Sequence, residues 1–252
     1  MADRDRIIEY LDDLLAVERF ADYGPNGLQV PGSGQVEHVV TGVSANLELF
    51  ERAAEAGADL VICHHGILWE FHPRTITPQV KARLSALFDA DMSLAAYHLP
   101  LDAHPEVGNN ALLCELLGLE RAEPFGEAKG SPIGWIGRSA AGVPAADLIG
   151  RVREALGQEP LVQGAGPGQV HAAAIVSGAG AGTIGDAAAL GIDMLVTGEP
   201  SEHAMADAQE AGMHFVAAGH YATETLGVRR LGELVAERFG VEHSFVEVRN
   251  PV

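Results

Sequence analysis

The length, composition and charge of this 252-residue chain exclude several classes of protein. Hydrophobic residues make up 47% of the chain, which is enough for one large or two smaller folded domains. Sixteen Lys and Arg residues oppose 35 Asp and Glu residues, and the resulting net charge of −19 repels a nucleic-acid backbone. The two cysteines, Cys63 and Cys114, suggest no disulfide framework, and no apolar run reaches the roughly 20 residues that span a bilayer. We therefore expect a cytoplasmic protein that binds neither nucleic acid nor membrane.

The elements predicted in chain order alternate between helices and short apolar strands. An amphipathic helix begins the chain, with Ile7, Ile8, Leu11, Leu14 and Leu15 on one face. Apolar runs bounded by Gly, Asp or His predict strands at 37–43, 59–63, 93–97, 133–138, 170–176, 193–197, 213–217 and 243–248. Helices are predicted between most of these strands, and the Gly/Pro-rich stretches 121–134 and 163–169 indicate connectors. This alternation is typical of an α/β fold.

An internal repeat indicates two similar α/β units. The stretch "VVTGVSANLELFERAAEAGADLVICHH" (39–65) aligns with "AIVSGAGAGTIGDAAALGIDMLVTGE" (174–199), and "LAAYHLPLD" (94–102) matches "FVAAGHYATE" (215–224). Each member of the second pair is a strand that ends at a histidine with a carboxylate four residues later, at His98/Asp102 and His220/Glu224. We expect duplicated units at residues 1–125 and 126–252, with the last segment packing back on the first. The alternative is that α/β units simply resemble one another.

Histidines and carboxylates collect where the predicted strands end. "ICHHGILW" (62–69) places His64 and His65 after one strand, and the pairs above follow two others. Ligands bind beyond the carboxyl ends of strands in open α/β sheets, and imidazole with carboxylate suits Zn, Mn, Fe or Ni. A lone histidine at a strand end is more often structural, so the prediction of a metal centre depends on the combination.

The number of these side chains favours two ions. Adjacent residues in an extended backbone point to opposite sides, so His64 and His65 suit two neighbouring ions better than one. Five or more ligands also exceed the three protein groups of a typical catalytic zinc site. We therefore predict a dinuclear site at the carboxyl ends of the strands, between the two units.

Other motifs keep more than one interpretation. His98 and His104 are candidates for orienting a ligand or for transferring a proton. "YGPNGLQVPG" (23–32) has the residues of a turn, and Glu199 in "TGEPSEH" lines the cavity or stabilises a helix start. "GAGAGTIGD" (178–186) resembles a phosphate-binding loop but has neither P-loop nor GxGxxG spacing.

Several motifs together resemble those of the Nif-three-like family, whose members are often labelled GTP cyclohydrolase one type two homologues. They run in one order from about residue 20 to the terminal "NPV": "DYGPNGLQV", "ADLVICHHG", "YHLPLDAHPEVGNNA", "TGEPSEH" and "AAGHYATETLGV". The resemblance implies a dinuclear metal site, two related α/β units and a ring-shaped homohexamer with its metal sites facing the interior. It assigns as ligands His64, His65, Asp102, His220 and Glu224, with Glu224 bridging the ions. The short 121–170 connection leaves no room for the domain inserted in longer relatives, so the chain resembles the compact form.

Two functions fit such a site. The first is a metal-dependent hydrolase acting on GTP, as in a cyclohydrolase, or on another nucleotide or phosphoester, with His98 or His104 moving a proton. The nearest cations in sequence, Arg74, Lys81, Arg229 and Arg230, form no obvious phosphate clamp and read as surface charge. The second is a non-enzymatic protein that stores, delivers or senses metal, for which ligands suffice. A scaffold with a structural metal is less favoured, because five ligands leave positions open on two ions.

Overall fold

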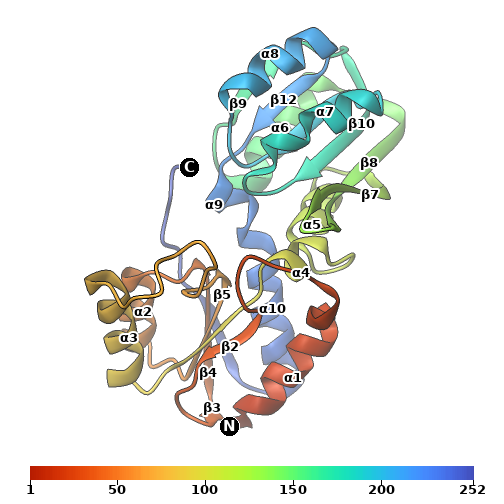
Figure 1. The fold of residues 1–252 in the computed structure, drawn as a ribbon. Coiled ribbons are helices and arrows are strands. Elements are labelled where there is room, and N and C mark those ends of the chain that lie inside the picture. Colours follow the sequence, from red (N-terminus) through yellow and green to blue (C-terminus); the bar gives the residue numbers. More distant parts are fainter. The chain divides into compact units, whose positions relative to one another are not determined.

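The computed structural model describes residues 1–252 and divides them into two compact units (Figure 1). The first unit comprises Met1–Leu101 and Gly227–Arg249, and the second comprises Asp102–Leu226 with Asn250–Val252. The chain passes from the first unit to the second within helix α4 (Leu99–Ala103) and returns within helix α10 (Thr225–Phe239). None of the helices combines the length and the apolar composition that a membrane-spanning segment requires.

The first unit is built on a five-stranded sheet with the order β13-β4-β5-β6-β2. The strands of this sheet are β2 (Gly27–Val30), β4 (His38–Ser44), β5 (Leu60–His65), β6 (Ser93–Ala96) and β13 (Glu242–Phe245). β1 (Ala2–Asp3) and β3 (Gln35–Val36) form a separate antiparallel pair. The helices are α1 (Arg4–Leu15), the 3-10 turn η1 (Val17–Arg19), α2 (Leu47–Glu55), α3 (Pro78–Asp89) and most of α10. Only β2 runs antiparallel to its neighbour in the five-stranded sheet.

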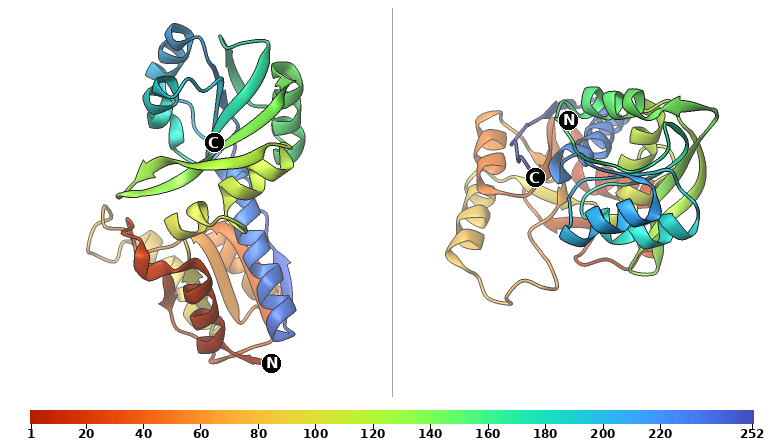
Figure 2. Two further views of the ribbon diagram at one scale, coloured as in Figure 1. Left: turned by 90° about the vertical axis from the view of Figure 1, so that its right-hand side faces the viewer. Right: turned by 90° about the horizontal axis from the view of Figure 1, so that it is seen from above.

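Helices cover both faces of this first sheet. Figures 1 and 2 show α2 and α3 side by side on one face, with α1 and α10 on the other. The α2 side contributes Leu49, Phe50 and Ala53 to a core that includes Val40 and Val61 of the strands. Because side chains alternate across a strand, Val39 and Leu60, which are also fully buried, point to the opposite face. The sheet is therefore buried on both sides, as parallel sheets usually are.

The second unit contains a six-stranded mixed sheet with the order β7-β8-β10-β11-β12-β9. Its strands are β7 (Glu120–Ala128), β8 (Ser131–Pro144), β9 (Leu161–Gly164), β10 (Gln169–Val176), β11 (Met194–Thr197) and β12 (His214–Ala217). Its helices are α5 (Asn109–Leu116), α6 (Ala145–Leu156), the 3-10 turn η2 (Gly180–Thr183), α7 (Ile184–Ala189), α8 (Glu202–Ala211) and α9 (His220–Thr223). β10, β11 and β12 run parallel, while β7, β8 and β9 join antiparallel.

Two hydrophobic cores form on the two faces of this second sheet. Leu113 of α5 and Leu148 of α6 pack with alternate strand residues on one face. Ile184 of α7 and Ala204 of α8 pack on the other face. Figure 2 (left) shows α6 on the side of the sheet opposite to α7 and α8.

The two units share a local plan that matches the repeat. In each, three parallel strands (β4-β5-β6 and β10-β11-β12) follow one another, and an antiparallel strand closes the edge beside the third. The Gly-x-Asp motif has the same role in both. Asp59 Oδ2 accepts hydrogen bonds from the backbone N–H groups of residues 37 and 38, at 2.7 and 3.1 Å. Asp193 Oδ2 accepts from those of residues 171 and 172, at 2.7 and 3.0 Å.

The predicted strands are present, but the boundary between units and two irregular segments differ from expectation. The first unit ends at Leu101 instead of residue 125, because the hairpin of β7 and β8 pairs with β10 and so belongs to the second sheet. The predicted connector 121–134 is thus mostly strand. It lacks an alternating pattern because β7 is an edge strand with several exposed side chains. The predicted turn 23–32 likewise contains β2.

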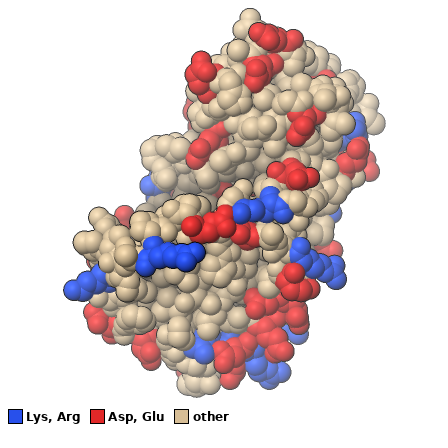
Figure 3. Space-filling model, in the orientation of Figure 1, with Lys and Arg blue, Asp and Glu red and all other residues tan.

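Carboxylates are spread over the face of the molecule seen in Figure 3. Lys and Arg side chains lie singly among them in this view and form no continuous stripe. The observation agrees with a chain in which acidic residues outnumber basic ones by 35 to 16.

Candidate metal centre

The two adjacent histidines lie at the carboxyl end of β5. His64 is completely buried, and its Nδ1 donates a hydrogen bond to the backbone carbonyl of Tyr97 at 2.9 Å. The lone pair of the neutral His64 ring is therefore on Nε2, which is the form that binds metal. His65 is partly exposed, and its Nδ1 lies 3.1 Å from the hydroxyl of Ser44.

His98, at the carboxyl end of β6, joins these two rings. One ring nitrogen from each of His64, His65 and His98 lies within 4.8 Å of the others. The ring centroids of His64 and His98 are 5.0 Å apart, and those of His65 and His98 are 5.5 Å apart. The first unit thus gathers three imidazoles, of which sequence reasoning gave two as ligands and one as a proton-transfer group.

Asp22 orients His98, and sequence reasoning missed it. Its Oδ1 accepts a hydrogen bond from His98 Nδ1 at 2.7 Å, and its Oδ2 accepts from Asn26 Nδ2 and from the backbone of Leu99. Burial favours the neutral acid, but the bonds and charge of His98 and the bond from Asn26 outweigh it and hold the pKa of Asp22 below its ordinary value. An ionised carboxylate behind an imidazole fixes the ring and its tautomer.

Two glycines let the Asp22 loop approach the histidine segment. A Cβ on Gly24 would lie 2.2 Å from the carbonyl oxygen of Leu68, and a Cβ on Gly66 would lie 2.3 Å from the amide of Gln29. Gln29 also bridges the segments, because its Oε1 accepts from the backbone of Ile67 and its Nε2 donates to the carbonyl of Pro25. The "DYGPNGLQV" motif is therefore a wall of the site as well as a turn.

Asp102 is the first candidate ligand of the second unit. It is 4% exposed, and its Oδ1 accepts hydrogen bonds from Asn109 Nδ2 at 2.8 Å and Ser177 Oγ at 3.1 Å. Asn110 holds the same region together, because its amide donates to the carbonyl of Ile133 and its Oδ1 accepts from the Ser177 backbone. The buried "GNNA" sequence thus positions Asp102.

His220 and Glu224 form the second group in this unit. Glu224 is 3% exposed, and one of its oxygens lies 3.0 Å from His220 Nε2, while Glu199 lies 2.6 Å from His220 Nδ1. Burial disfavours the imidazolium, but Glu224 and Glu199 outweigh it and raise the pKa of His220 to about 9. A carboxylate oxygen of Asp102 also lies within 4.8 Å of one of Glu224. Two buried carboxylates this close favour a positive charge beside them, which either the His220 imidazolium or a metal ion can supply.

Gly178 explains part of the glycine-rich segment that follows β10. Its φ is +61°, and a Cβ there would lie 2.4 Å from a Glu224 oxygen and 3.1 Å from His220 Nε2. Gly178 also accepts hydrogen bonds at its carbonyl from the backbone of Gly198 and Glu199. The glycine at this position makes room for the His220–Glu224 pair.

Two predicted details need adjustment. Tyr97 and Ala218 occupy matching positions after β6 and β12, because each donates its N–H to the last paired residue of the strand before it in the sheet. His98 therefore corresponds to Gly219, and His220 lies one residue further along. His104 Nδ1 accepts hydrogen bonds from the backbone of Glu106 and Val107, both at 3.1 Å, so this nitrogen serves the local turn.

Comparison with known proteins identifies the family of this chain. The family model described as Duf34/NIF3 (NGG1p interacting factor 3) matches residues 2–251. A Pseudomonas aeruginosa protein named GTP cyclohydrolase 1 type 2 homolog is 43% identical over 245 residues, which cover 97% of each chain. An Escherichia coli protein of the same name is 40% identical over 244 residues, covering 96% of this chain and 97% of the relative. A solved Thermus thermophilus structure, 36% identical, covers both chains completely with a TM-score of 0.89. The chain belongs to the Duf34/NIF3 family.

Proposed function

We propose that this protein binds two divalent metal ions and acts as a metal-dependent hydrolase. The ligands in this proposal are His64, His65, Asp102, His220 and Glu224, with Glu224 shared by both ions. The observation that carries it is the pair of buried carboxylates, Asp102 and Glu224, with oxygens within 4.8 Å of each other. The neutral tautomer of His64 adds a nitrogen donor, and mixed nitrogen and oxygen donors suit Zn, Mn, Fe or Ni.

Divalent ions held by these residues would act as Lewis acids toward a substrate oxygen and would promote ionisation of water. The chain itself supplies a proton-transfer group in His98. Asp22 fixes His98 Nδ1 as a donor, so Nε2 is the nitrogen that accepts or releases a proton. His104 suits this role less well, because Nδ1 of its ring is engaged by backbone N–H groups.

The substrate class in this proposal is GTP, as in a cyclohydrolase reaction, or another nucleotide or phosphoester. The names of the curated relatives support it. The alternative is storage, delivery or sensing of metal, which needs the same ligands without His98 or a substrate. The His98→Gln variant separates the two functions, because an imidazole oriented by a carboxylate suits both a metal ligand and a proton-transfer group.

Metal content and turnover of two variants test the proposal. The full chain is purified without a histidine tag, and metal per chain is measured after loading with Mn, Zn, Fe or Ni. Glu224→Gln removes a negative charge from both ions and is expected to lower the affinity for both. His98→Gln is expected to keep both ions and to lose hydrolysis in a screen of nucleotides and phosphoesters.

Each result has a defined consequence. Two ions at wild-type affinity in Glu224→Gln would show that Glu224 is not a shared ligand. Equal metal loss in His98→Gln would make His98 a ligand. Turnover by the wild type that His98→Gln abolishes supports the hydrolase, whereas a loaded wild type that turns over no substrate supports storage or delivery.

A further inference from the structure

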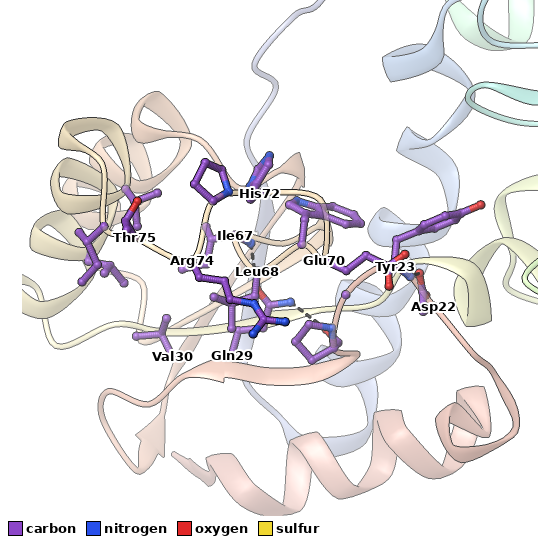
Figure 4. A pocket seen from close by; sticks show the side chains of 17 residues that line it. Asp22, Tyr23, Gln29, Val30, Ile67, Leu68, Glu70, His72, Arg74 and Thr75 are labelled. Atoms are coloured by element: carbon purple, nitrogen blue, oxygen red, sulfur yellow. Dashed lines mark hydrogen bonds between the residues drawn. The ribbon is translucent and has the colours of Figure 1, made fainter.

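A cavity in the first unit lies beside the histidine cluster and contains none of the proposed metal ligands. Its volume is about 650 Å³, within the usual range for small-molecule sites. Figure 4 shows its wall, which comes from the Asp22 loop, β2 and the segment after His65. The apolar part of the lining is Val30, Ile67, Leu68, Ile76, Val80 and Leu84.

A narrow gap of about 10 Å³, the size of a single water, adjoins this cavity. Its lining includes His64 and His98, and it shares Gly24, Gln29 and Trp69 with the large cavity. The shared residues therefore form the wall between a molecule in the large cavity and the imidazoles. This proximity to the histidines distinguishes the cavity from an unrelated surface hollow.

Trp69 gives the cavity an aromatic wall. Its ring lies edge-on to His98 with centroids 5.1 Å apart, and it stacks on Phe71 at 5.4 Å with an interplanar angle of 19°. Its Nε1 donates a hydrogen bond to the carbonyl of Gly66 at 2.9 Å, which holds the ring in place. A fixed aromatic surface favours a flat ring as ligand.

Charge restricts the ligand further. Arg74 is the one Lys or Arg in the lining, and it has no ion-pair partner. Figure 4 shows its side chain extending from its loop toward Gln29. Asp22 and Glu70 line the same cavity. A single cation among two acids can hold one small anionic group, whereas a triphosphate would be repelled.

We propose that this cavity binds a flat aromatic or heteroaromatic molecule with one small anionic group, either a carboxylate or a monophosphate. Arg74 binds the anion and Trp69 contacts the ring, which places the ring edge toward His98. For any reaction of this ligand the proposal rests on the proposed function and selects, among its substrate classes, a monophosphate over GTP. The binding itself requires no metal. The two proposals can therefore fail separately.

Fluorescence of Trp69 tests the binding directly. The chain has two tryptophans, so Trp135→Phe leaves Trp69 as the reporter. The metal-free full chain is titrated with nicotinate and guanosine monophosphate as aromatic carboxylate and phosphate. Guanosine, guanosine triphosphate and ribose 5-phosphate complete the panel. Calorimetry on the wild-type chain repeats each titration, so the test survives if Trp135→Phe fails to fold.

Saturable quenching by nicotinate or guanosine monophosphate is expected, and the probe that responds identifies the anionic group. Guanosine and the triphosphate are expected to bind more weakly, and ribose 5-phosphate not at all. Arg74→Gln is expected to weaken the affinity for the responding probe about tenfold or more, the usual effect of losing a charged hydrogen bond. Lys81→Gln, which removes an exposed cation outside the cavity, is the matched control and is expected to change nothing.

Three results would overturn the proposal. They are no binding of nicotinate or guanosine monophosphate at millimolar concentration, equal binding of ribose 5-phosphate, and unchanged affinity for the responding probe in Arg74→Gln. Ligand binding by a chain that takes up no metal would support the cavity and refute the metal proposal. Metal uptake without binding of either probe would support the metal proposal and refute the cavity proposal.

Discussion

At the residue scale, the site depends on backbone positions that admit only glycine. Gly178 combines a φ of +61° with the lack of space beside Glu224. Gly182, in the same glycine-rich segment, has open space around it and no such φ. Glycine is therefore required by the structure at position 178, whereas Gly182 only adds to a glycine-rich composition that resembles a phosphate-binding loop.

Gly178→Ala is expected to lower the free energy of unfolding by about 2 kcal/mol or more, from left-handed strain and the displaced carboxylate. It is also expected to reduce metal content, because Glu224 must move. Gly182→Ala is the control and is expected to stay within about 0.5 kcal/mol of the wild type. Urea unfolding measures both, and similar values for the two variants would contradict the role given to Gly178.

At the element scale, an aspartate at an equivalent position stabilises the start of a strand in each unit. Asp59 and Asp193 each precede a parallel strand and accept two backbone N–H groups from the neighbouring strand. Gly57 and Gly191 each lie two residues beyond the end of the preceding helix and have similar φ values of +72° and +65°. The repeat is therefore present in the hydrogen bonds as well as in the amino-acid sequence.

Asp59→Ala and Asp193→Ala are each expected to destabilise the chain by about 1–2 kcal/mol, because each leaves two N–H groups without their acceptor. Hydrogen exchange should localise the loss to the unit that carries the change. Glu210→Ala, at an exposed position of α8, is the control. If only one of the two substitutions lowers the free energy of unfolding, the two aspartates are equivalent in geometry but not in their contribution to stability.

The pairing of β13 with β4 contains a group that links stability to pH. His243 Nε2 lies 2.8 Å from the hydroxyl of Thr41, and a Cβ on Gly232 would clash with the ring. Burial lowers the pKa of His243 below its ordinary 6.5. The charges of His38 and Arg229 lower it further, and the charge of Glu233 opposes the shift.

Because the pKa is lower in the folded chain, the unfolded chain takes up this proton first as the pH falls. The stability that the neutral ring contributes is therefore present above about pH 6.5 and is lost progressively below it. Urea unfolding at pH 7.5 and 5.0 is expected to show a smaller loss in His243→Gln than in the wild type. An equal loss in both would mean that other groups account for the pH dependence.

At the scale of the whole molecule, we propose that the chain assembles as a homohexamer. The family resemblance of the motifs implies this assembly, and apolar side chains such as Phe71 and Ile76 are exposed on the isolated chain, at 65% and 71%. Light scattering at micromolar concentration is expected to give about six times the chain mass of 26.4 kDa. A monomer mass would contradict the assembly.

Much of this molecule is encoded locally. Apolar runs and the positions of Gly and Asp determined the eight main strands, the α/β class and the repeat, because these patterns reflect which face of an element is buried. The histidines at strand ends were predictable for the same reason, since a polar side chain after a buried run marks where the chain leaves the sheet. None of these inferences required knowing which strands are neighbours.

Only the tertiary structure decided the remaining features. Asp22 and His98 are separated by 76 residues, and no local sequence pattern predicts their hydrogen bond. β7 is an edge strand with a weak pattern, so its pairing with β8 and the boundary at Leu101 could not be predicted from composition. The cavity at Trp69 and Arg74 likewise exists because Gly24 and Gly66 let two distant segments touch. Periodicity records the burial of each element, whereas these features depend on the packing of segments that chain folding brings together.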